Sequence, residues 1–136
     1  MTHAKLRERT AEFARRITYL IRPLLKSAEA QDAARQLRRA ANGVASNYRA
    51  AGLGRSHAEF TSKLGVVLEE ADESVYWLGY LRDTDLAAGP ELLALLNEAQ
   101  ELTKIFSKSC QTAHERERGA EESRDRQRGR TRTPRR

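Results

Sequence analysis

The chain has 136 residues, of which 25 are lysine or arginine and 19 are aspartate or glutamate, so its net charge at pH 7 is +6. This length accommodates one domain with a hydrophobic core. The single cysteine, Cys110, excludes an internal disulfide, and no apolar run approaches the roughly 20 residues of a membrane-spanning helix. We therefore expect a cytoplasmic protein that does not contact a membrane.

The charges are distributed unevenly along the chain. Residues 1–55 carry 12 basic and 4 acidic side chains, whereas residues 56–114 carry 4 basic and 10 acidic ones. Two explanations remain open. In the first, the basic half and the acidic half are two separate solvated surfaces. In the second, the basic face of one subunit contacts the acidic face of another subunit.

Apolar residues recur at helical spacing in four segments, which are residues 2–26, 29–51, 56–83 and the segment from Pro90 onward. Pro23 lies inside the first segment and predicts a kink or an early end there. Ser56 and Glu59 have the spacing of a capping box, and Pro90 suits the first position of a helix. The pattern predicts an all-α fold, an antiparallel up-down four-helix bundle over residues 1–114.

The C-terminal segment, residues 115–136, lacks the apolar residues that could offset the entropy cost of ordering it. We therefore predict a disordered basic tail. Its last part, residues 124–136, holds seven arginines and one acid. The tail either contacts phosphates or only keeps the protein soluble, and the sequence leaves both roles open.

The second segment predicts a cationic helix face. At 100° per residue, its arginines, Asn42 and Ser46 fall on the side opposite the apolar stripe. A guanidinium fork matches the geometry of phosphate oxygens, so this face is a candidate nucleic-acid surface. Its alternatives are an ordinary solvated face or ion pairs with the acidic helix. With two arginines from the first segment, the predicted nucleic-acid contacts are Arg15, Arg22, Arg35, Arg38, Arg39 and Arg49.

The third segment predicts a helix with a second, partly apolar face that points away from the core. Exposed aromatic patches usually mark contact sites, and Trp and Tyr are favoured anchors. We therefore predict a homo-oligomer interface, although the aromatic rings could instead cover a large core. The predicted interface residues are Val66, Glu69, Glu73, Tyr76, Trp77 and Tyr80.

Carboxylate runs raise an enzyme hypothesis. The E-E-x-x-E pattern that begins at Glu69 and the E-x-x-E pattern that begins at Glu98 resemble the magnesium site of all-α nucleotide pyrophosphohydrolases. The first three carboxylates diverge around their helix, which argues against a shared ion. No Glu-x-x-His pair or phosphate-binding glycine loop is present in the sequence. We expect no catalytic residue, no metal and no cofactor.

Two stretches together resemble a bacterial family of four-helix-bundle proteins, those related to the proteins encoded in 23S rRNA intervening sequences. The first is QLRRAANGVASNYRAAG, from Gln36, and the second is FTSKLGVVLEEADESVYWLGYL, from Phe60. The resemblance covers about residues 10–112, and the order and spacing of its matches are fairly specific. The chain departs from the family pattern at Gly43, usually a small hydroxyl residue, and at Ala50, commonly acidic.

The resemblance implies an up-down bundle that assembles into a ring, most often a pentamer. The same group includes the accessory protein of diversity-generating retroelements, and these relatives bind nucleic acid and a reverse transcriptase through basic surfaces. The leading hypothesis is thus a ring-forming, non-enzymatic bundle that binds RNA or assists a nucleic-acid enzyme such as a reverse transcriptase. The alternatives are a homo-oligomeric protein scaffold without a nucleic-acid role and the nucleotide hydrolase.

Overall fold

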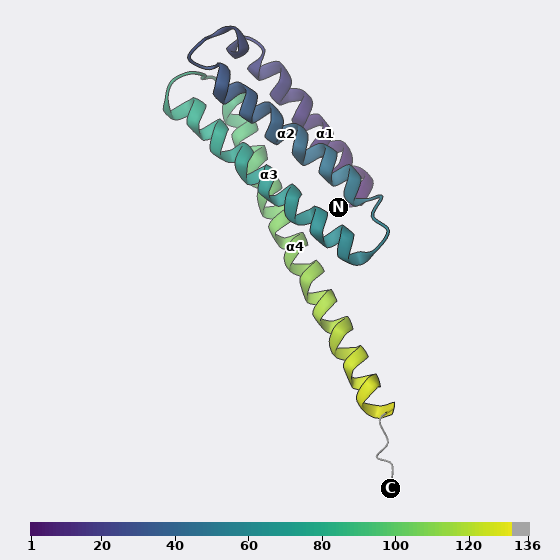
Figure 1. Cartoon of the computed structure of the whole chain (residues 1–136). Coiled ribbons are helices and arrows are strands. Elements are labelled where there is room, and N and C mark those ends of the chain that lie inside the picture. Colours follow the sequence, from purple (N-terminus) through teal and green to yellow (C-terminus); the bar gives the residue numbers. More distant parts are fainter. Residues whose placement is uncertain (132–136) are drawn as a thin grey trace.

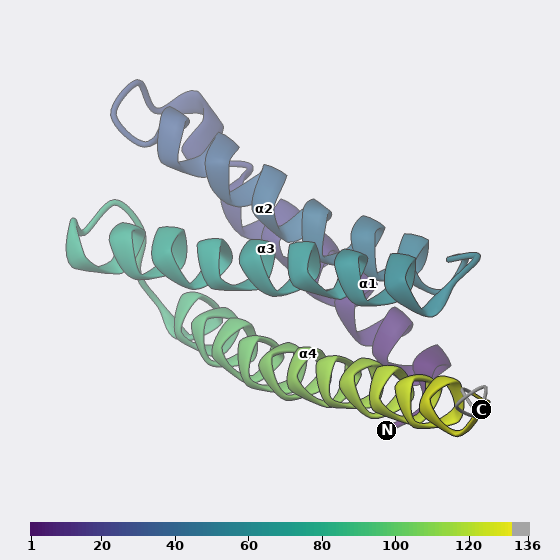
Figure 2. The same ribbon diagram turned by 60° about the horizontal axis from the view of Figure 1, so that its bottom comes forward.

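A computed structural model describes residues 1–131 of the chain. Within this range the fold is an antiparallel four-helix bundle with one short 3-10 helix (Figure 1). In chain order the elements are α1 (His3–Ile21), η1 (Leu24–Lys26), α2 (Gln31–Ala51), α3 (His57–Asp83) and α4 (Pro90–Thr131). The predicted fold class is therefore confirmed. In the turned view of Figure 2, α3 runs beside both α2 and α4.

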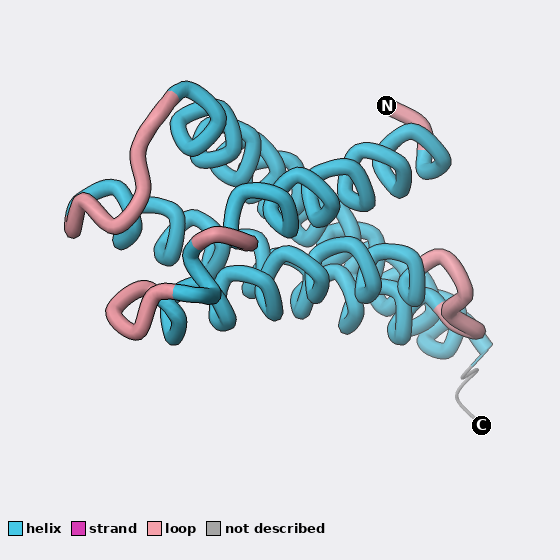
Figure 3. The backbone as a smooth tube through the Cα atoms, turned by 90° about the horizontal axis from the view of Figure 1, so that it is seen from above, coloured by secondary structure: helices cyan, strands magenta, loops and turns pink. Residues whose placement is uncertain are grey.

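The helix ends follow the local signals of the sequence. α1 stops at Ile21 and Pro23 precedes the 3-10 turn, as expected for a residue that cannot donate a backbone hydrogen bond. The Ser56 hydroxyl accepts a hydrogen bond from the Glu59 backbone N–H at 3.1 Å and thereby caps α3. In the loop before α4, Gly89 has a φ of 107°, which favours glycine. Figure 3 shows these short loops closing the two ends of the bundle.

The core lies between all four helices, and each contributes large side chains that are fully buried. Examples are Phe13 and Ile17 from α1, Leu37 and Val44 from α2, Leu64 and Leu78 from α3, and Leu95 and Phe106 from α4. Apart from the buried Tyr48 near its end, the rest of the inner face of α2 consists of buried alanines, including Ala33, Ala34, Ala40 and Ala41. Small side chains let α3 approach this face closely, which positions α2 between α1 and α3.

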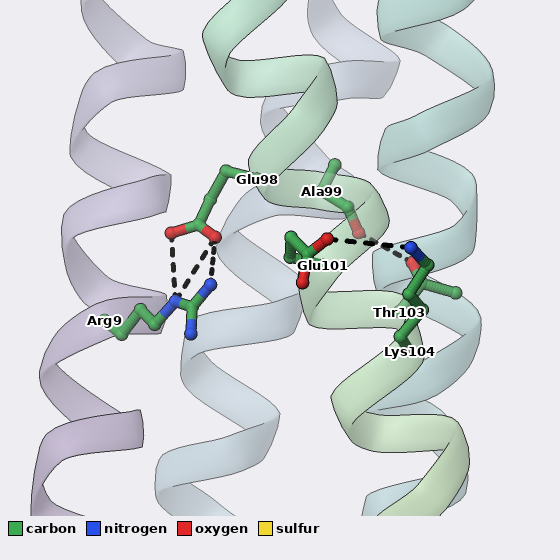
Figure 4. Close-up of polar contacts among 6 residues, drawn as sticks. All are labelled: Arg9, Glu98, Ala99, Glu101, Thr103 and Lys104. Carbon is green, nitrogen blue, oxygen red and sulfur yellow. Dashed lines mark hydrogen bonds and ion pairs between the residues drawn. The ribbon is translucent and has the colours of Figure 1, made fainter. Parts of the chain in front are cut away.

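Two ion pairs join α1 to α4 within one chain. The Arg9 guanidinium donates through Nε to both oxygens of Glu98, at 3.2 and 3.1 Å, and also through a terminal nitrogen (Figure 4). Arg16 pairs with Glu91 at 2.9 Å. Part of the basic first half thus pairs with the acidic second half within one chain.

α4 is the longest helix, with 42 residues, and its last buried side chain is Ala113. Residues 115–131 continue as an exposed helix that projects from the bundle (Figure 1). Disorder of the free tail in solution stays a prediction, and residues 132–136 of the predicted tail lie outside the described residues. Its Ala, Glu, Gln and Arg content favours a helix, and Arg126 lies 3.7 Å from Glu122 one turn earlier. No helix in residues 1–131 combines the length and apolarity needed to cross a membrane.

Candidate nucleic-acid interface and subunit-contact surface

A polar groove of about 600 Å³ lies between the outer surfaces of α1 and α2. Two small residues, Ala11 and Ala45, keep the space between the helices open. Guanidinium, carboxylate, amide and hydroxyl groups surround them. The complete lining is Arg7, Glu8 and Ala11 from α1 and Asn42, Ala45, Ser46 and Arg49 from α2.

The groove brings together one part of the predicted cationic face. Arg49, Asn42 and Ser46 of α2 line it, and Arg7 of α1 adds a second guanidinium. In residues 1–131, neither arginine pairs with a carboxylate within 4.0 Å. Two side chains that can bind phosphate oxygens are therefore available in the lining of a concave site.

The remaining arginines of α2 do not line the groove. Arg35, Arg38 and Arg39 are all exposed and form no ion pair within the part of the chain that the structure describes. Arg39 lies toward α3, where its charge acts against the rise in the pKa of Glu70. These three residues extend the electropositive surface of α2 beyond the groove.

The two predicted arginines of α1 occupy different environments. Arg15 forms ion pairs with Glu8 at 2.7 Å and with Glu12 at 2.8 Å, and these hydrogen bonds raise its pKa. Its guanidinium is therefore already paired with two carboxylates of its own helix. The guanidinium carbon of Arg22 lies 4.7 Å from the centre of the exposed Tyr19 ring, a cation–π contact at the other end of the helix.

Sequence reasoning missed Arg7. Arg7, Ala11 and Arg15 are spaced by four residues and therefore share one side of α1. This row faces the cationic side of α2 only because the two helices are antiparallel neighbours. The four-residue spacing could have placed these residues on one side of α1. Only the pairing of α1 with α2 shows that this side contributes to the groove.

Glu70 is a half-buried carboxylate at the junction of α2 and α3. Its side chain packs over Gly43, where a Cβ atom would lie 2.8 Å from the Glu70 Cδ atom. Burial raises the pKa of Glu70, with further contributions from Glu73 and Glu69. Gly43, a departure from the family pattern, thus leaves room for this carboxylate.

The predicted interface residues of α3 form an aromatic cluster, which we define as Tyr76, Trp77 and Tyr80. Their ring centres are 4.9 Å apart for Tyr76 and Trp77 and 5.5 Å apart for Trp77 and Tyr80. Tyr76 is 60% exposed and Tyr80 is 39% exposed, whereas Trp77 is half-buried and packs partly on the core. The indole N–H donates to Glu73 at 3.4 Å.

Of the other predicted interface residues, Glu73 contacts the cluster, and Glu69 and Val66 lie farther toward the start of α3. Glu69 and Glu73 are exposed, and Val66 is half-buried. The surface is therefore apolar at its centre and acidic at its edge, a composition that suits contact with another protein surface.

The two carboxylate runs do not converge on one place. Glu70 faces Gly43 of α2, whereas Glu98 is bound to Arg9 of α1. Among residues 1–131, no group of three or more His, Cys, Asp or Glu side chains is placed to share a metal ion. This arrangement offers no support for the magnesium site of a nucleotide pyrophosphohydrolase.

The chain resembles known proteins over nearly the whole bundle. It is similar to a protein of unknown function from the S23 ribosomal protein family of Bacteroides thetaiotaomicron VPI-5482, whose crystal structure was determined at 1.70 Å. The two share 27% identity with a TM-score of 0.74, over 82% of this chain and 99% of that chain. No curated protein matches the sequence significantly.

Residues 3–108, which run from the start of α1 through the core-forming part of α4, match a defined protein family. The match includes the groove between α1 and α2 and the aromatic cluster of α3, and it excludes the projecting part of α4. On this match the chain belongs to the 23S rRNA-intervening sequence protein family.

Proposed function

We propose that this protein is a non-enzymatic helical bundle that binds nucleic acid, RNA in the first place, through the groove between α1 and α2. The observation that carries the proposal is the pair of free guanidiniums, Arg7 and Arg49, at a concave polar site. Arg35, Arg38 and Arg39 extend the same surface. The family takes its name from intervening sequences of 23S rRNA, which makes RNA the first polyanion to test.

The salt dependence of RNA binding gives a quantitative test. On a single strand, each phosphate contact contributes about −0.7 to the slope of log affinity against log salt concentration. If all five arginines contact phosphates, we expect a slope of about −3.5. The measurement is fluorescence anisotropy of a labelled RNA oligonucleotide across a salt series. Absence of binding at low salt would rule out this function.

Variants show whether the groove supplies these contacts. Replacing both Arg7 and Arg49 by glutamine should reduce the magnitude of the slope by about 1.4, the share of two phosphate contacts. Arg55→Gln/Arg82→Gln is the matched control, because it also removes two exposed positive charges and neither residue lines the groove. An equal reduction of the slope in the two variants would show that the total positive charge, rather than the groove, determines RNA binding.

We further propose that the protein self-associates through the aromatic cluster of α3 and forms a ring, with a pentamer as the expected size. Two tyrosines with large exposed areas, next to a partly exposed indole, support a contact surface. A ring would repeat the cationic groove around its circumference and so increase avidity for a long polyanion. An accessory role beside a nucleic-acid enzyme such as a reverse transcriptase is compatible with this arrangement.

The second candidate function is a homo-oligomeric scaffold that has no nucleic-acid role, and the aromatic cluster favours it equally. Light scattering coupled to size-exclusion chromatography separates the possibilities. Tyr76→Ser should reduce the molar mass, because Tyr76 is the most exposed residue of the cluster and its loss should leave the fold intact. The exposed Tyr19→Ser is the matched control. An oligomer without RNA affinity would favour the scaffold, and a monomeric wild-type protein would remove the ring.

A further inference from the structure

The groove between α1 and α2 combines groups that a simple polyanion would not need. Glu8 lies in it together with Arg7 and Arg49. An ionised carboxylate only accepts hydrogen bonds and repels phosphate, so the stretch of the groove beside Glu8 is a poor place for a phosphate group. Arg7 and Arg49 suit phosphates, whereas Glu8 calls for a ligand group that donates hydrogen bonds.

The polar groups of the groove match a sugar and a base. One oxygen of Glu8 pairs with Arg15 at 2.7 Å, and the carboxylate retains further lone pairs for a ligand donor. The Asn42 amide can donate and accept, as can the Ser46 hydroxyl. A ribose 2′-hydroxyl and the amino or imino groups of a base are donors of the required kind.

The groove is large enough to hold an unpaired nucleotide. Its volume of about 600 Å³ falls within the range of small-ligand sites. Ala11 and Ala45 offer a small apolar surface for a ribose or a base, and guanidinium planes can stack on unpaired bases. A duplex keeps its bases paired inside a stiff helix and could reach only the rim.

We infer that this groove holds an unpaired RNA nucleotide, whose sugar and base enter between the helices while its phosphates meet Arg7 and Arg49. This inference rests on the proposed RNA-binding function and names its ligand as single-stranded rather than double-stranded RNA. It predicts that affinity depends on the open space of the groove as well as on its charge.

The test fills the groove without changing any charge. In the variant Ala11→Leu/Ala45→Leu, two half-buried alanines gain bulk from opposite walls. A second variant, Ser46→Leu, changes an exposed groove residue and does not affect core packing. The matched control is Ala94→Leu, the same substitution at an exposed position of α4. Circular dichroism establishes that each variant is folded.

Three probes are compared at one salt concentration by competition anisotropy: a 12-nucleotide single-stranded RNA, the same sequence as a duplex, and heparin. Wild-type protein should prefer the single strand. Both groove-filling substitutions should weaken single-strand binding by about tenfold, the order expected for losing one stacked base, and change duplex and heparin binding less than about twofold. Ala94→Leu should change none of the three.

Equal affinity of the wild-type protein for single strand and duplex would overturn the inference, as would equal effects of groove filling on all three probes. In both cases the proposed RNA-binding function would survive. If none of the probes binds at low salt, the proposed function itself fails.

Discussion

The ion pair between Arg9 and Glu98 should hold α1 in the position that forms the groove. Arg9 follows Arg7 and Glu8 directly in the chain, and its guanidinium makes three hydrogen bonds to the Glu98 carboxylate on α4. These hydrogen bonds raise the pKa of Arg9. The perturbation is a double-mutant cycle with Arg9→Met, Glu98→Gln and the combined variant.

The burial of the pair sets the expected magnitude. The side chains of Arg9 and Glu98 are only 29% and 20% exposed, so water screens their attraction incompletely. Hydrogen bonds to charged groups contribute about 1.5–3 kcal/mol, and the partial desolvation of both groups offsets some of this. We expect a coupling free energy of about 1.5 kcal/mol in this cycle. The Arg15–Glu12 pair, with side chains 52% and 55% exposed, serves as the control and should show no measurable coupling.

The assay is urea denaturation of each variant, monitored by far-ultraviolet circular dichroism. Arg9→Met and Glu98→Gln should each lower the free energy of unfolding, and the double variant should lose less than the sum of the two. If the two pairs gave the same coupling, the pair would be an ordinary surface contact and could not be what positions α1.

Four further predictions concern other parts of the fold. Phe106→Ala should lower the free energy of unfolding by about 3–5 kcal/mol, whereas Leu93→Ala, at a 55% exposed position, should change it by less than about 0.5 kcal/mol in the same urea assay. Gly43→Ala should raise the free energy of unfolding by about 0.5–1 kcal/mol, because alanine favours the helix and the new Cβ atom displaces only the flexible end of Glu70. A lower free energy of unfolding would show that the Glu70 side chain cannot move aside. Burial raises the pKa of Glu70 above its value in the unfolded chain, so the contribution of Glu70 to the free energy of unfolding should be largest at low pH and should fall as the pH rises through its titration. In Glu70→Gln, this part of the pH dependence of the free energy of unfolding should disappear. Burial also raises the pKa of the Cys110 thiol, so the native protein should react with a thiol reagent much more slowly than the urea-unfolded protein.

The helices of this chain could be predicted from sequence because their signals are local. The apolar spacing, the Ser56 cap and the position of Pro90 locate α3 and α4, and the structure confirms both starts. The end of α4 could not be predicted by the same reasoning. Residues 115–131 have no apolar stripe, so burial gives no signal for the helix that the structure has there, and only the helix propensity of the Arg and Glu residues favours it.

The candidate site was predictable only in part, because a groove between two helices depends on which residues meet across them. Asn42, Ser46 and Arg49 could be found on one helix face from their spacing alone. Arg7 comes from another helix, and the ion pair of Arg15 with Glu8 depends on side-chain conformation as well as on spacing. Likewise, no pattern on α3 indicated that Glu70 turns toward Gly43 of α2.

Photo-crosslinking tests most directly whether the groove is the place where RNA binds. A single-stranded RNA that contains 4-thiouridine would be irradiated with the full-length protein, and crosslinked peptides would be identified by mass spectrometry. We predict that the crosslinks fall on residues 7–11 of α1 and 42–49 of α2. Crosslinks confined to α3 or to the projecting part of α4, at an RNA concentration that saturates binding, would contradict the account.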